Sequence, residues 1–398
     1  MNNILIIVER LSSGGVAVET LKTINYLVSL NYKVKVLSFE QPSVLLVSEL
    51  ESMNVEILVT PESKFKLISR LLFIINLLKE NSKNKNAIIL AQHLYPSFIV
   101  SFFCLVRSVK IISVIHTDLC NYYRSSNWYK KIFVRILLFL IKNKNIIIVS
   151  KESIIDSINK FGKLNATYIP NAVYSGNGQN YKHVKSLGYL SKKTKIRILL
   201  VGSLVKLKRV DSALRIIKNV SERSDKSIVF QIAGDGKEKE QLKELAKKLN
   251  IDSMVEFLGH VSDISAVYNE SDILLSTSEM EGLPLNLIEA IGYGMPIVAN
   301  NCNTGPREIM LEGGSVNDSL TFDNNINVTN VGLLIKGDYN DYNYSVKICE
   351  HEKNIANAIL FLFDTEMIFN NERQLLEYNE YSVMFKWESY LNKVLNCN

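Results

Sequence analysis

The sequence lacks any cysteine pattern that would indicate disulfides or a metal site. Its five cysteines are scattered, with no CxxC pair and no Cys/His ligand spacing. An odd, unpatterned set fits a reducing compartment in which each cysteine acts as a small apolar residue. The N-terminus enters an apolar run directly, without a basic segment before a long apolar one. We therefore expect no signal peptide and a cytoplasmic protein.

Long hydrophobic runs and dinucleotide-binding patterns are also absent. Residues 86–106 carry no formal charge, but they include His93 and Pro96, and a strand followed by a helix fits them better than a transmembrane span. The first apolar run is followed only by Gly14 and Gly15, not by Gly-x-Gly-x-x-Gly, which argues against a Rossmann oxidoreductase. No nucleic-acid-binding module with interleaved basic and aromatic residues is visible, so we expect no nucleic-acid partner.

Charge is distributed unevenly over the 398 residues. Residues 1–170 hold 21 Lys and Arg against 11 Asp and Glu, a net charge of +10, whereas residues 195–398 hold 21 against 29, a net of −8. A basic first half suggests contact with something anionic, such as a membrane surface, a lipid diphosphate or nucleic acid. Drift in composition is the alternative explanation.

One basic segment, residues 128–144, has two distinct helical faces. Its basic and apolar residues fall on different sides, which are Asn127, Lys131, Arg135 and Lys142 on one and Trp128, Ile132, Phe133, Ile136 and Phe139 elsewhere. Such a helix either lies in the plane of a membrane surface or packs on a sheet with its basic face in water. The sequence leaves both possibilities open.

Short apolar runs alternate with helix-length segments in two series, which predicts parallel βαβ units. The expected strands of the first series are 4–9, 34–39, 55–59, 87–91, 110–115, 145–150 and 166–169, and those of the second are 196–202, 228–234, 255–259, 273–277, 296–300 and 331–335. We expect a first domain over 1–172, a linker over 173–194, a second domain over 195–370 and a C-terminal helix over 371–398. Residues 312–330 are polar and predict a loop.

The strongest motif is the segment SEMEGLPLNLIEA at residues 278–290. Gly282 permits a tight turn, and Pro284 suits the first turn of a helix, whose leading N–H groups would form an anion site. Glu281 precedes this helix, and Glu289 lies about 7.5 Å along the axis from Pro284 at ~1.5 Å per residue. Two carboxylates therefore flank a site suited to a diphosphate, although spacing alone does not exclude a plain structural helix.

This segment resembles the E-x7-E element of retaining family-4 glycosyltransferases with the GT-B fold. Further segments resemble the family in the same order along the chain, and they are Tyr168–Val173, Val201–Asp211, Ile232–Gly236, Val255–Gly259, Ile291–Val298 and Thr304–Ile309. The last is similar to a variant found in enzymes that build bacterial surface polysaccharides. The resemblance covers nearly all the chain and is densest over 196–336.

The resemblance implies an α/β GT-B fold. Two Rossmann-like domains would face an interdomain cleft, and the C-terminal helix would return to the first domain. It also implies three catalytic residues. Lys208 would neutralise the donor diphosphate, Glu281 would hold hydroxyls of the donor sugar, and His116 would contact that sugar from the end of strand 110–115. From the residue alone, a structural role for His116 is the alternative.

The same resemblance assigns the donor-binding positions. Glu289 would hold the ribose of the nucleotide. The other positions are Gly14, Gly15, Gly202, Ser203, Lys208, Arg209, Glu281, Gly282, Leu283, Pro284 and Leu285. Two of them depart from the family pattern, because Ser203 stands where Arg is usual and Arg209 where Gly is common. Lys206 or Arg209 would then compensate for the missing guanidinium.

No Asp-x-Asp pair occurs in the sequence. Metal-dependent nucleotide-sugar enzymes typically hold a divalent ion with such a pair, so we expect no metal ion, no cofactor and activity that survives chelation.

The implied reaction moves a hexose or N-acetylhexosamine from a UDP-linked donor to a lipid-linked or oligosaccharide acceptor, with retention. It would serve capsule, O-antigen, lipopolysaccharide or exopolysaccharide synthesis at the cytoplasmic face of the inner membrane. The basic first domain would contact anionic lipid peripherally. The alternative is a GT-B nucleotide-sugar enzyme without transfer, such as an epimerase.

Overall fold

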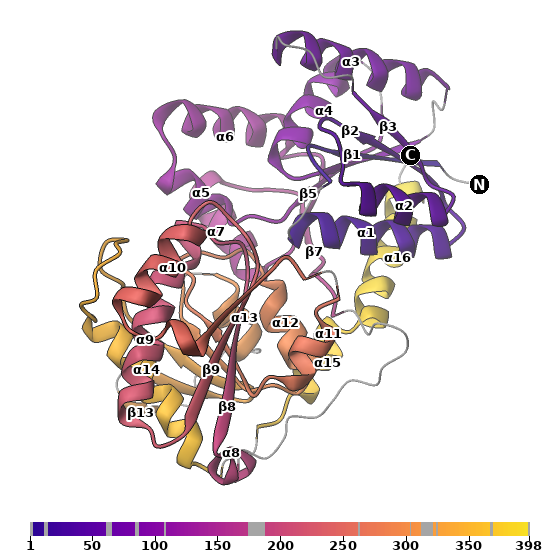
Figure 1. Cartoon of the computed structure of the whole chain (residues 1–398). Helices are drawn as coiled ribbons and strands as arrows, with labels where there is room; N and C mark the ends of the chain where they lie inside the picture. Colours follow the sequence, from indigo (N-terminus) through magenta and orange to yellow (C-terminus); the bar gives the residue numbers. More distant parts are fainter. Residues whose placement is uncertain are drawn as a thin grey trace. The chain divides into compact units, whose positions relative to one another are not determined.

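The chain forms two compact units in the computed structural model (Figure 1). Unit 1 comprises residues 1–171 and 383–398, and unit 2 comprises residues 172–382. The structure describes residues 3–11, 15–60, 66–83, 87–106, 109–173, 188–261, 263–302, 304–311, 321–323, 325–366 and 369–396.

Unit 1 is built on a seven-stranded parallel sheet. Its strands are β1 (Asn3–Val8), β2 (Lys33–Ser38), β3 (Glu56–Val59), β4 (Ile88–Gln92), β5 (Ile111–Ile115), β6 (Asn145–Ile148) and β7 (Ala166–Tyr168), in the order β3-β2-β1-β4-β5-β6-β7. All seven apolar runs of the first series are confirmed as strands. Every residue of β4 and β5 is buried, as expected for a parallel sheet covered on both faces.

The helices of unit 1 alternate with these strands. They are α1 (Gly15–Ser29), α2 (Val44–Ser52), α3 (Lys66–Lys83), α4 (Leu94–Val106), α5 (Leu119–Ser125), α6 (Trp128–Ile141) and α7 (Lys151–Phe161). None of the helices that the structure describes is both long and apolar enough to cross a bilayer.

The C-terminal helix α16 (Glu380–Asn396) belongs to unit 1 from residue 383 onward, which confirms its predicted return (Figure 1, yellow). The Tyr26 hydroxyl of α1 donates to the Met384 carbonyl at 2.5 Å, and the Lys110 ammonium donates to the carbonyls of the last turn. Trp387 is buried, whereas Phe385 is 72% exposed. Two residues apart on a helix, they point to different sides.

Unit 2 contains a mixed eight-stranded sheet. Its strands are β8 (Lys195–Val201), β9 (Ser227–Ala233), β10 (Val255–Gly259), β11 (Ile273–Ser276), β12 (Ile297–Asn300), β13 (Thr321–Asp323), β14 (Ile326–Thr329) and β15 (Gly332–Ile335), in the order β10-β9-β8-β11-β12-β15-β14-β13. The six predicted strands are confirmed and are parallel. β13 and β14 form an antiparallel hairpin in the polar segment that we expected to be a loop.

The helices of unit 2 are α8 (Gly188–Lys192), α9 (Val210–Arg223), α10 (Lys239–Lys248), α11 (Ser265–Glu270), α12 (Leu285–Gly292), α13 (Pro306–Leu311), α14 (Glu350–Asp364) and α15 (Glu372–Tyr378). Helix α8 lies inside the segment expected to be a linker, because Leu190 is fully buried in the core of unit 2. The preceding residues 174–187 lie outside the described part of the chain.

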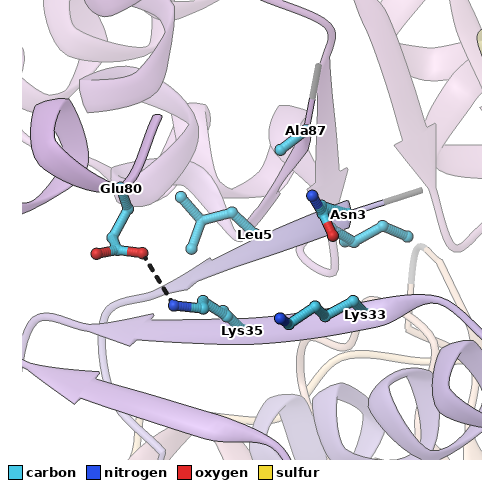
Figure 2. Close-up of a pocket in the computed structure, with 7 residues that line it drawn as sticks. Asn3, Leu5, Lys33, Lys35, Glu80 and Ala87 are labelled. Atoms are coloured by element: carbon cyan, nitrogen blue, oxygen red, sulfur yellow. Dashed lines mark hydrogen bonds and ion pairs between the residues drawn. The ribbon is translucent and has the colours of Figure 1, made fainter. Parts of the chain in front are cut away.

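A small pocket lies at the amino ends of β1, β2 and β4 in unit 1 (Figure 2). The Lys35 ammonium in this pocket is 2.7 Å from the Glu56 carboxylate and 3.2 Å from that of Glu80, and these partners raise the pKa of Lys35. Substrate sites of open parallel sheets lie at the opposite, carboxyl edge. We therefore assign this pocket a structural ion cluster rather than the substrate site.

Buried charges tie α9 to α14 in unit 2. The guanidinium of Arg215 is 2.7 Å from Asp211 and 2.7 Å from Glu352, and all three side chains are almost fully buried. Its Nη1 also donates to the carbonyl oxygens of Asn343 and Ser345. Such a network is favourable only while every member keeps its partners.

Arg215→Ala should therefore destabilise unit 2 strongly. Removing the guanidinium leaves the buried Glu352 carboxylate without its cation, while Asp211 keeps its ion pair with Arg209, at a cost of about 3–5 kcal/mol. Lys243→Ala is the control, since its ion pair with Glu240 is exposed and is worth about 1 kcal/mol or less. Calorimetric unfolding measures both variants, and an equal effect of the two substitutions would contradict this account.

Candidate active site

The candidate site lies at the carboxyl edge of the unit 2 sheet, where the strand order reverses. Strand β8 lies between β9 and β11, so the chain winds in one direction from β8 through β9 to β10 and in the other from β11 to β12. The loops after β8 and β11 therefore diverge at this point and leave room for a ligand.

Hydrogen bonds join these two loops. The Thr277 hydroxyl donates to the Lys208 carbonyl at 2.9 Å, and the Glu279 N–H donates to the Leu207 carbonyl at the same distance. The Asn286 side chain then donates to the carbonyl of Val201, the last residue of β8, at 2.9 Å. The motif around Glu281 is thus fixed against the loop that carries Lys208.

The loop after β12 supports the same motif from its other side. The Thr304 hydroxyl donates to the Glu281 carbonyl at 2.7 Å. Gly305 has φ +82°, and a Cβ there would lie 2.6 Å from both the Gly282 carbonyl oxygen and a Pro284 ring carbon. Only glycine therefore allows this close approach without a shift of the backbone.

Lys208 and Glu281, both expected to be catalytic, form an ion pair. The ammonium Nζ is 2.5 Å from the carboxylate Oε1, and the side chains are 24% and 10% exposed. Lys208 ends a short 3-10 helix, Lys206–Lys208, and Glu281 precedes α12. Each charge is balanced by the other.

Helix α12 begins beside this ion pair. Leu285 is its first residue and Pro284 its N-cap, and no side chain caps the helix. The leading N–H groups of a helix have no acceptor within it and attract anions. Three of the expected donor-binding residues form the turn that leads into α12. Leu283 and Pro284 are buried there, and Gly282 is half-buried.

Glu289 is held by an aromatic neighbour at the fifth position of α12. The Tyr268 hydroxyl donates to its carboxylate at 2.9 Å, and the Tyr268 ring stacks on that of Tyr293 at 5.0 Å. Burial and the carboxylate raise the pKa of Tyr268 well above its ordinary value, so the hydroxyl remains a donor at neutral pH. Tyr268 therefore fixes the direction of the Glu289 carboxylate.

Arg209 is placed differently from the expectation that it binds the donor. Its side chain is fully buried, pairs with Asp211 and Glu279, and lies 4.5 Å from the centre of the Tyr339 ring. These contacts turn the guanidinium into the protein. By contrast, Ser203 and Lys206 are exposed, so Lys206 is the cation that is accessible beside Lys208.

Unit 1 holds a second group of polar residues at the carboxyl ends of β4 and β5. His116 Nε2 donates to the Gln92 amide oxygen at 2.8 Å. Removal from water and the nearby His93 lower the pKa of His116 to about 3, so the ring is neutral at pH 7. A neutral imidazole can exchange hydrogen bonds with a hydroxyl but cannot neutralise a phosphate.

His93 is the neighbour that the sequence prediction missed. Its Nδ1 accepts from the Leu94 N–H at 2.8 Å, so the proton lies on Nε2, which is 3.0 Å from the Thr117 hydroxyl. Burial lowers its pKa. Gly15 is exposed at the first position of α1, whereas Gly14 lies outside the described residues.

The sequence prediction also missed the side chains of Tyr268, Asn286 and Thr304, which fix the unit 2 site. Thr304 lies in the TGPREI segment already noted, so that segment was the available clue. Tyr268 is 21 residues from Glu289 and shares no motif with it. Across the described ranges, no group of three His, Cys, Asp or Glu side chains is arranged to hold a metal ion.

The low pKa of His116 makes stability depend on pH. The unfolded chain protonates a histidine near pH 6.5 and the folded protein near pH 3, so the unfolded state binds more protons between these values. The free energy of unfolding should therefore fall as the pH falls through this window. His116→Gln should make the decrease shallower, as measured by denaturant unfolding from pH 7 to pH 4.5. Parallel profiles for the two proteins would refute the assignment.

Most of unit 2 matches a known protein family. Residues 188–336 match the family model described as glycosyl transferases group 1. The amylovoran biosynthesis glycosyltransferase AmsD of Erwinia amylovora is 36% identical over 153 residues, which are 38% of this chain and 43% of that protein. The chain thus spans less than half the length of this curated relative.

Two solved structures share the fold over their whole length. TarM of Staphylococcus aureus, in complex with Fondaparinux, alpha-GlcNAc-glycerol and UDP, gives a TM-score of 0.75 at 15% identity, with 100% of both chains covered. HepE of Anabaena, in complex with UDP and glucose, gives 0.71 at 16% identity, with 99% of this chain and 100% of that chain covered. The chain therefore has the GT-B fold, and its residues 188–336 match a glycosyl transferases group 1 domain.

Proposed function

We propose that the protein transfers a hexose or N-acetylhexosamine from a UDP-linked donor to a lipid-linked or oligosaccharide acceptor, with retention. The product would enter capsule, O-antigen or exopolysaccharide synthesis on the cytoplasmic face of the inner membrane. The donor site would be the carboxyl edge of unit 2, and no metal ion or cofactor is part of the proposal.

One observation carries the donor assignment. The helix start at Leu285 lies between Glu281, which precedes it, and Glu289, which Tyr268 orients. A nucleotide-sugar has hydroxyls at both ends and a diphosphate between them. Carboxylates accept hydrogen bonds from hydroxyls, and helix N–H groups donate to phosphate, so the order of groups matches the donor. Glu281 would hold the sugar and Glu289 the ribose.

Donor binding would exchange the partners of Lys208. Its ammonium pairs with Glu281. A diphosphate placed at the start of α12 offers it a stronger anion, and Glu281 would then be released to accept hydrogen bonds from sugar hydroxyls. Lys208 would also stabilise the negative charge that develops on the departing diphosphate, with Lys206 as the second cation.

The roles in unit 1 follow from the neutral state of His116. An uncharged ring held by Gln92 is suited to a sugar hydroxyl, which is the contact that the family resemblance implies. Retention rests on that resemblance as well. A same-face attack in which the donor phosphate accepts the proton of the acceptor would need no protein nucleophile.

The acceptor and pathway are proposed from the relatives. AmsD is named for amylovoran biosynthesis, and TarM was solved with Fondaparinux, alpha-GlcNAc-glycerol and UDP. A saccharide acceptor on a surface-polysaccharide pathway is consistent with both. The epimerase alternative has no specific observation in its favour, and a donor-only assay would detect it.

Two glutamate variants should separate the ends of the donor. Glu289→Ala should weaken the binding of both UDP and UDP-sugars by about 10- to 100-fold, because each hydrogen bond from a ribose hydroxyl to a charged group is worth ~1.5–3 kcal/mol. Glu281→Ala should weaken the binding of UDP-sugars. It should leave the binding of UDP unchanged or make it tighter, because the Glu281 carboxylate no longer competes with the diphosphate for Lys208. Thermal-shift titrations with UDP, UDP-glucose and UDP-N-acetylglucosamine measure these effects.

Glu270→Ala is the matched control, since this exposed glutamate ends α11 near Tyr268 but outside the site. It should bind every ligand as the wild type does. The donor proposal fails if no nucleotide or nucleotide-sugar raises the melting temperature of the wild type, or if both site variants lose UDP equally.

A further inference from the structure

Helix α6 exposes an unusual number of large apolar side chains. Trp128 is 73% exposed, Phe139 70%, Tyr129 53%, Ile132 48% and Ile136 41%. We call these five residues the α6 surface. Single exposed apolar residues are common in proteins, but a contiguous group marks an interaction site.

These residues form one stripe along the helix. Positions 128, 132, 136 and 139 are three or four residues apart, so their side chains follow one another on the same side. The opposite side of α6 packs into the unit 1 core through Val134, Leu137, Leu138 and Ile141. Helix α6 therefore packs into the core through other residues, and the α6 surface is not part of the core.

A basic stripe borders the α6 surface. Its members are Lys131 and Arg135, each one position before an isoleucine of the α6 surface, and Lys142, the C-cap of the helix. Helix α6 contains no acidic residue. Among the described residues, none of these cations forms an ion pair. Instead, Lys131 and Arg135 lie 5.8 and 5.5 Å from the centre of the Tyr123 ring. Their charge remains available to an external anion.

We propose that α6 docks the protein on an anionic lipid bilayer, with the helix in the plane of the membrane and the α6 surface among the acyl chains. The tryptophan, tyrosine and phenylalanine side chains suit the apolar interior of a bilayer, and the lysine and arginine side chains beside them suit its charged headgroups. The basic residues would then contact anionic headgroups.

Charge favours lipid over a second copy of this chain. In a two-fold contact through α6, the same surface would face itself, and the basic stripes of the two copies would lie close together. Like charges in an interface oppose association. An anionic bilayer instead complements the stripe, and a fluid surface admits protruding Trp128 and Phe139 without a matching groove.

This inference deepens the proposed function, since a lipid-linked acceptor is presented at such a surface, but its test needs no sugar donor. The protein has two tryptophans, and Trp387 is buried. Vesicles that contain phosphatidylglycerol should shift the fluorescence of the exposed Trp128 to shorter wavelength and should sediment the protein. Vesicles of phosphatidylcholine alone should do so weakly, and salt should reduce binding.

Two α6 variants separate the apolar and charge contributions. Trp128→Ala/Phe139→Ala should lower the partition coefficient by at least about tenfold. Lys131→Gln/Arg135→Gln/Lys142→Gln should lower it about fivefold for each charge removed, on anionic vesicles only. Tyr381→Ala/Phe385→Ala is the matched control, because these aromatic residues of α16 are 81% and 72% exposed. All variants should keep the melting temperature and the nucleotide response of the wild type.

Three results would overturn the proposal. Wild-type protein could fail to bind anionic vesicles, or the α16 control could lose as much binding as the α6 variants. Light scattering could also show a dimer without vesicles that Trp128→Ala/Phe139→Ala dissociates, which would make the α6 surface a contact between copies. Unchanged UDP binding alongside any of these results would leave the donor assignment standing.

Discussion

The hydrogen bonds between the loops after β8, β11 and β12 are the constraint on which the site depends. Thr277 and Glu279 join the second loop to the first, and Thr304 joins the third to the second. Without them, Lys208 and Glu281 would be charges on separate loops. With them, a cation, a carboxylate and a helix start are fixed at one edge of the sheet, which is where open α/β sheets bind ligands.

The buried Arg209 side chain stabilises this edge of the sheet from the protein interior. Its φ of +50° lies in the left-handed region, which explains why glycine is common at this position in the family pattern. Here the guanidinium pairs with Asp211 and Glu279 and lies against Tyr339. These contacts offset the backbone strain and fix Glu279, two residues before Glu281. The side chain that was expected to bind the donor therefore supports the loop that carries Glu281.

Short apolar runs predicted the fold well because the strands of a buried parallel sheet are continuous runs of Ile, Leu and Val. All the parallel strands were found this way. The β13–β14 hairpin was missed because its segment is polar. The Ser, Gly, Lys and Tyr residues of segment 173–194 likewise concealed α8.

The site was predictable only where one segment carries it. Glu281, the turn and Glu289 lie within nine residues, so the motif contained both carboxylates. The Lys208–Glu281 pair joins positions 73 apart, and the partner of Glu289 is Tyr268, on another helix. The burial of Arg209 depends on Tyr339, far along the chain. Such contacts arise only when the strands assemble.

We propose above all that unit 2 holds a nucleoside diphosphate between Glu281 and Glu289. The most direct measurement is a crystal structure of the protein with bound UDP. We predict the ribose hydroxyls within hydrogen-bonding distance of Glu289, the diphosphate at the start of α12, and the Lys208 ammonium moved from Glu281 to phosphate. UDP bound elsewhere, or with its ribose toward Glu281, would contradict this account.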